Sequence, residues 1–93
     1  MTQIARHVRI EGRVQGVWFR GWVVDEARAR GLSGWVRNRR DGSVKAVFAG
    51  PEPEVQDMVA LCRHGPPAAE VSTVKEGKAA MPAQPGFRQA PTE

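Results

Sequence analysis

Residues 33–49 of the chain read SGWVRNRRDGSVKAVFA. Two segments that contain β-branched and aromatic residues, 33–40 and 43–49, stand on either side of the dipeptide Asp41-Gly42. An Asp-Gly dipeptide between two such segments is a strong short-range signal for a β-hairpin. The sequence therefore predicts two neighbouring antiparallel strands near the middle of the chain.

One strand and one helix are predicted before this hairpin. Apolar and polar residues alternate from Ile4 to Val14, which is typical of a half-buried strand. Residues 22–30 carry their apolar side chains on one side of a helix, and Gly31 is well placed to end that helix.

A second helix and weaker strand signals follow the hairpin. Residues 50–53, Gly-Pro-Glu-Pro, break the chain. An apolar stripe at helical spacing comes next and consists of Val55, Met58, Val59 and Cys62. Residues 69–76 are predicted as a strand and residues 86–90 as a short last strand, whose partner and register the sequence leaves open.

The order strand, helix, strand, strand, helix, strand predicts an α+β fold. It is the ferredoxin-like βαββαβ sandwich, in which two helices cover one face of an antiparallel sheet. A length of 93 residues corresponds to one domain. We therefore expect a single domain over residues 1–93, with a core at about 4–76 and a Pro-rich C-terminal segment at 77–93. Many functions occur on this fold, so function has to be argued from a site.

Composition narrows the class of protein. No apolar run approaches the ~20 residues of a membrane span, and the first residues lack the apolar region of a signal peptide. Cys62 is the only cysteine, which excludes an internal disulfide and favours a reducing compartment. We expect a cytoplasmic protein with no membrane partner. Nothing in the sequence demands an oligomer, so we expect a monomer.

A glycine-punctuated loop follows the first strand. Residues 12–21 read GRVQGVWFRG, in which Arg20 lies just before the predicted helix. Backbone N–H groups in such a loop, together with one guanidinium, suit an anion the size of phosphate. Taken alone, Arg20 also fits an ordinary surface arginine, and Gly16 also fits a simple turn.

Three segments of the chain resemble the acylphosphatase family. They are G-x-V-Q-G-V-x-F-R at residues 12–20, GWVRN at 34–38 with DGSV at 41–44, and CRHGPPAA at 62–69. The similarity runs from about Arg6 to about Val74, in the order and spacing of the family. The resemblance implies a ferredoxin-like fold and hydrolysis of acyl phosphates to a carboxylate and inorganic phosphate, which would also inhibit. It implies no cofactor and no metal.

The resemblance also implies roles for particular residues. Arg20 would bind the phosphoryl group, and Asn38 would orient the attacking water. The backbone amides of the phosphate loop would be those of Gln15, Gly16, Val17, Trp18, Phe19 and Arg20. Asn38 on its own equally fits a turn residue before Asp41-Gly42.

Several residues carry simpler interpretations. Val14, Val17 and Phe19 are expected to pack under the loop, and Cys62 is expected to be a buried structural thiol. Trp18 either caps the loop, lines the acyl side of the pocket or packs on the surface. The basic residues Arg37, Arg39 and Arg40 are expected to be solvated.

The alternative function is a non-catalytic anion-binding or RNA-binding ferredoxin-like module. RNA-recognition domains of this fold need an aromatic-rich motif on the sheet face. The third strand, residues 44–49, has one aromatic residue and no such motif. We therefore expect no nucleic-acid partner.

Overall fold

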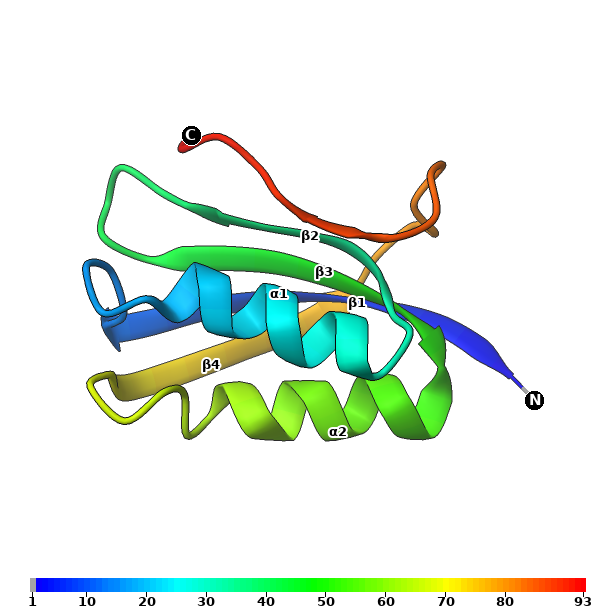
Figure 1. Cartoon of the computed structure of the whole chain (residues 1–93), viewed down its shortest axis with the longest axis horizontal. Coiled ribbons are helices and arrows are strands. Elements are labelled where there is room, and N and C mark those ends of the chain that lie inside the picture. The colour runs from blue at the N-terminus through cyan, green and yellow to red at the C-terminus, as the bar shows by residue number, and fades with distance from the viewer. Residues whose placement is uncertain (1) are drawn as a thin grey trace.

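Two helices lie against one face of a five-stranded sheet in the computed structural model, which describes residues 2–93 (Figure 1). The elements are β1 (Gln3–Arg13), α1 (Phe19–Ala29), β2 (Ser33–Asn38), β3 (Val44–Pro51), α2 (Glu52–Cys62), β4 (Glu70–Lys78) and β5 (Phe87–Gln89). This order confirms the predicted ferredoxin-like βαββαβ fold.

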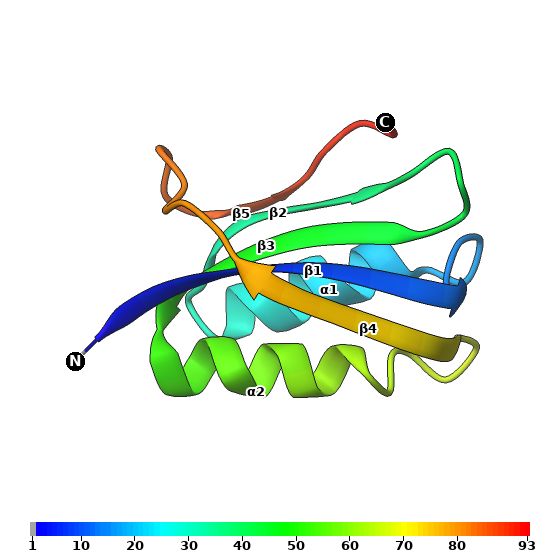
Figure 2. The ribbon, with the colours of Figure 1, turned by 180° about the vertical axis from the view of Figure 1, so that it is seen from behind.

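The sheet has the strand order β4-β1-β3-β2-β5. Strand β1 pairs antiparallel with both β3 and β4, and β2 pairs antiparallel with β3 as the hairpin predicts. Strand β5 adds a parallel pairing to β2, with Gly34 opposite Phe87, so the sheet is mixed and not purely antiparallel as predicted. The chain between β4 and β5 crosses from one edge of the sheet to the other (Figure 2). Strand β4 runs opposite to β1 and β2, and the chain reverses direction before β5, so β5 runs parallel to β2.

The hydrophobic core lies between the sheet and the two helices. Every residue of the predicted stripe on α2 is buried, as are Val23, Val24 and Ala27 of α1. Phe87 from β5 stacks on Phe48 from β3, with ring centroids 5.4 Å apart. The core therefore includes a residue of the C-terminal segment and extends beyond the expected span of 4–76.

Helix α1 begins at Phe19, three residues before the predicted start at Trp22. Trp18 ends the loop in a left-handed conformation, and its carbonyl accepts the N–H of Trp22 at 3.1 Å. Phe19 is buried in the core, which anchors the first turn. As a consequence, Arg20 lies in the first turn of the helix and not in the loop before it.

Candidate active site

The loop before α1 and the end of β2 lie at the same end of the sheet. Strands β1 and β2 both run antiparallel to β3, so they run parallel to each other on either side of it. The carboxyl ends of β1 and β2 therefore lie at the same end of the sheet. There the loop before α1 and the β2–β3 hairpin lie side by side (Figure 1). This topology brings together residues that are well separated in the sequence.

A cavity of about 170 Å³ opens between these two segments. Its lining residues are Val14, Gly16, Trp18, Phe19, Arg20, Gly21, Asn38 and Gln89. Arg20 and Asn38, the two residues singled out from the sequence, thus border one cavity. Of the six predicted loop residues, Gln15 and Val17 do not line it. Gln89, from β5, lines it and was not foreseen, because the sequence left the place of β5 open.

The surroundings of Arg20 favour an anion. Within residues 2–93, its guanidinium makes no hydrogen bond and no ion pair to the protein. The first turn of α1 contains no acidic residue. The partial positive charge of the helix N-terminus and the charge of Arg20 therefore act at the cavity together, without an internal counter-charge.

Asn38 is the last residue of β2 and presents an unsatisfied acceptor. Its Oδ1 atom is buried and has no hydrogen-bond partner in the described part of the chain. A buried polar atom without a partner costs about 1–3 kcal/mol, so it calls for an explanation. An acceptor at the wall of a polar cavity can take a hydrogen bond from a water molecule held there.

Trp18 stands at the rim of the cavity in an unusual conformation. Its backbone has φ 61° and ψ 26°, and its side chain is 64% exposed. The indole lies against Gly21, since a Cβ built on Gly21 would overlap Nε1 of the ring and lie 2.7 Å from Cδ1. The structure shows a specific reason for glycine, because any side chain there would displace the indole.

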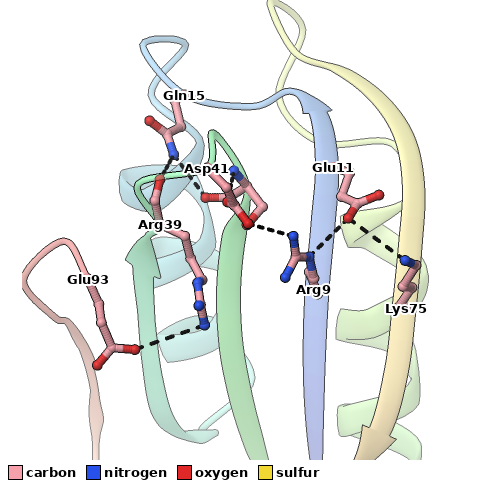
Figure 3. Close-up of polar contacts among 8 residues, drawn as sticks. Arg9, Glu11, Gln15, Arg39, Asp41, Lys75 and Glu93 are labelled. Carbon is pink, nitrogen blue, oxygen red and sulfur yellow. Dashed lines mark hydrogen bonds and ion pairs between the residues drawn. The ribbon is translucent and has the colours of Figure 1, made fainter.

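The side chain of Gln15 joins the loop to the hairpin (Figure 3). Its Nε2 donates to the main-chain carbonyl oxygens of Arg39 at 2.7 Å and of Ser43 at 2.9 Å. These two carbonyls flank the turn that follows Asn38. The sequence pattern pointed only to the backbone of Gln15, although its primary amide, which carries two N–H donors, was a visible signal.

The turn itself is held by Asp41. Its Oδ1 accepts hydrogen bonds from the N–H of Ser43 at 2.9 Å and from Oγ of Ser43 at 2.6 Å, and its Oδ2 forms an ion pair with Arg9 of β1. The hydrogen bonds from Ser43, and then the charge of Arg9, lower the pKa of Asp41 to about 2. The hairpin is thus tied to β1 as well as to the loop (Figure 3).

The arginines near Asn38 are more ordered than expected. Arg37 forms an ion pair with Glu93 at 2.7 Å, and its guanidinium carbon lies 4.6 Å from the centre of the Trp35 ring. Arg39 lies 4.0 Å from the other carboxylate oxygen of Glu93. These contacts are partly exposed, so the cluster keeps its basic character while Glu93 orders it.

The apolar residues under the loop and the cysteine lie where the sequence predicts. Val14 and Phe19 are buried and Val17 is partly buried, which confirms that they pack under the loop. Cys62 is fully buried, and burial raises the pKa of its thiol to about 12. In residues 2–93 we find no cluster of three or more metal-ligating side chains, and none of the helices is long and apolar enough to cross a membrane.

Comparisons with known proteins agree on one family. The acylphosphatase family model matches residues 6–89. The chain is 55% identical to an acylphosphatase of Rhodospirillum rubrum over 85 residues, which cover 91% of this chain and 93% of the relative. It is 53% identical to an acylphosphatase of Nitrobacter hamburgensis over an alignment that covers 99% of each chain. The solved structure of an acylphosphatase from Coxiella burnetii superimposes with a TM-score of 0.90 at 33% identity, covering 95% of this chain and 93% of that one.

Proposed function

The chain belongs to the acylphosphatase family, and from that membership we propose that it hydrolyses acyl phosphates in the cavity between Arg20 and Asn38. The family makes the chain a hydrolase with an acyl phosphate as substrate. One observation carries the proposal for the site. An uncompensated guanidinium and an unsatisfied amide oxygen line the same small cavity.

Arg20 binds the phosphoryl group in this proposal. A guanidinium presents two parallel N–H groups that match two phosphate oxygens, which lysine cannot reproduce. The backbone amides of residues 15–20 and the start of α1 add partial positive charge. Inorganic phosphate carries the same oxygens, so it is expected to compete with the substrate.

Asn38 orients the attacking water. Its buried Oδ1 accepts one water hydrogen and so fixes the oxygen toward phosphorus. The water oxygen bonds to phosphorus while the bond from phosphorus to the bridging oxygen breaks, and that electron pair leaves on the carboxylate. The water protons pass to phosphate and solvent. Because the carboxylate is a stable anion, no general acid is needed, and catalysis rests on positioning and charge stabilisation. We propose that no metal takes part.

The test is hydrolysis of acetyl phosphate and benzoyl phosphate by the whole chain, with and without EDTA. We expect activity in EDTA, competitive inhibition by phosphate, and a loss of at least about 100-fold in kcat for Asn38→Ala. Arg20→Lys is expected to weaken both phosphate inhibition and turnover. Arg13→Lys, an exposed arginine on the same strand–loop segment, serves as the control.

Two results would contradict the proposal. Unchanged turnover in Asn38→Ala would remove that residue from the reaction, and a strict requirement for Mg²⁺ would rule out the metal-free mechanism. Salt-sensitive RNA binding without hydrolysis would favour the alternative binding module.

A further inference from the structure

We propose that the indole of Trp18 forms the acyl-group side of the cavity and makes the enzyme prefer acyl phosphates with aromatic or other bulky apolar acyl groups. The inference rests on the proposed function, because it assigns the part of the substrate beyond the phosphoryl group. It concerns which acyl phosphate is used, and not how the phosphate bond is broken.

The cavity offers only one apolar surface to a substrate. Val14 and Phe19 are each 1% exposed, so their side chains are used in the core. Gly16 and Gly21 have no side chain, and the other lining residues apart from Trp18 are polar. Trp18, at 64% exposed, is the lining residue left with accessible apolar area. An apolar acyl group that leaves water at this cavity therefore has to pack on the indole.

The structure of an acyl phosphate places its acyl group at the rim of the cavity, beside Trp18. If the phosphoryl group lies against Arg20 and the loop amides, the bridging oxygen and carbonyl carbon point outward. The remainder of the acyl group then begins at the rim. Trp18 directly precedes the first turn of α1, which carries Arg20, so the indole and the guanidinium border the cavity from the same segment.

The backbone conformation of Trp18 supports a role of this residue in binding a ligand. Among the non-glycine residues of 2–93, Trp18 is the one with a positive φ. Such a conformation is uncommon for a bulky residue and costs about 1 kcal/mol or more. Core packing does not offset this cost, because most of the ring is in water. A strained and exposed tryptophan at the rim of a cavity is explained if the ring serves a ligand.

Gly21 holds the indole in place. The ring occupies the space in which a Cβ of residue 21 would lie. The indole therefore packs against the first turn of α1 on one side, which restricts its rotation and lowers the entropy lost on binding. A supported aromatic wall discriminates between substrates better than a freely rotating side chain does.

The experiment measures the ratio of kcat/KM for benzoyl phosphate to kcat/KM for acetyl phosphate. We expect this ratio to fall about ten-fold in Trp18→Gly, which is the size of effect that one lost apolar contact in a pocket gives. Glycine accepts the positive φ, so the loop keeps its backbone conformation. Trp18→Phe is expected to keep most of the ratio. Met81→Ala removes another exposed large apolar side chain and is expected to change neither activity nor ratio.

Gly21→Ala tests the support of the ring. The added methyl group displaces the indole, so we expect the ratio to fall as in Trp18→Gly. In Trp18→Gly the same alanine is expected to lower the ratio no further, because the ring is already absent.

An unchanged ratio in Trp18→Gly would overturn the inference, as would an equal loss for both substrates, which would mark a damaged loop. In either case wild-type hydrolysis of acetyl phosphate would leave the proposed function standing. Failure of the wild type on both substrates would instead reject that function.

Discussion

The Nε2 atom of Gln15 lies 2.7 Å from the main-chain carbonyl oxygen of Arg39 and donates a hydrogen bond to it. Arg39 follows Asn38 directly, so this bond joins the loop on the Arg20 side of the cavity to the strand end on the other side. A second hydrogen bond from the same atom, to Ser43, fixes the far side of the turn. One amide side chain thus helps to set the distance between the two halves of the site.

Replacing Gln15 by methionine is expected to loosen this connection. Methionine matches the length of glutamine but donates no hydrogen bond. Two hydrogen bonds are therefore lost, each of which contributes a net stability of about 1 kcal/mol. We expect urea unfolding to show a loss of about 1–2 kcal/mol, with a fall in kcat that exceeds the change in phosphate inhibition. Gln56→Met, on the exposed face of α2, is the control. Wild-type stability and kcat in Gln15→Met would show that the bridge is unimportant.

The ion pair and hydrogen bonds of Asp41 predict a pH dependence. Folding lowers the pKa of Asp41 from 3.8 to about 2, so its contribution to stability is present above pH 4 and is lost as the pH falls toward 2. Asp41→Asn is expected to lower the Tm at pH 7 but not near pH 2. Asp25→Asn, which has no ion-pair partner in the described residues, is the control. If Asp41→Asn lowered the Tm by the same amount at pH 7 and at pH 2, the effect would not come from the ionised carboxylate of Asp41.

Gly34 of β2 is expected to tolerate no side chain. It has φ 134°, and a Cβ there would overlap the carbonyl oxygen of Val47 and meet the ring of Phe87 at 3.3 Å. We expect Gly34→Ala to cost about 3 kcal/mol or more, measured by urea unfolding. Gly77→Ala is the matched control, because a Cβ at that position meets nothing within 4 Å. Equal stabilities for the two variants would show that the pairing of β2 with β3 can shift.

Cys62 is expected to resist thiol reagents in the native protein. It is fully buried, and its pKa of about 12 leaves almost no thiolate at neutral pH. Labelling by a disulfide reagent should therefore wait for unfolding and become complete in urea. Fast labelling without denaturant would mean that α2 opens locally.

Much of the fold follows from local patterns in the sequence. Asp41-Gly42 marks the hairpin, and the stripe on α2 at helical spacing gives the buried side of that helix. The pairing of β5 does not follow, because a three-residue strand carries too little alternation to show its partner. Its place depends on the contact of Phe87 with Phe48, which lies 39 positions earlier in the printed sequence.

The candidate site is only partly accessible to sequence reasoning. The resemblance selected Arg20 and Asn38, and the parallel course of β1 and β2 explains how they come to border one cavity. The side-chain contacts of Gln15 and the left-handed backbone of Trp18 depend on neighbours far along the chain or on space left by Gly21. Local sequence propensities do not predict these two features, because both arise only when the sheet is assembled.

The sheet order also bears on how the protein is made. Of the five strands in this sheet, β1 is synthesised first, and it lies in the interior of the sheet between β3 and β4. A nascent chain that has emerged only as far as α1 therefore offers β1 no partner, and both of its edges stay open to other chains. Closure requires contacts between distant parts of the sequence, for which folding times of milliseconds to seconds are usual. During synthesis, the strand that leads into the loop of residues 14–18 is therefore the one most in need of protection.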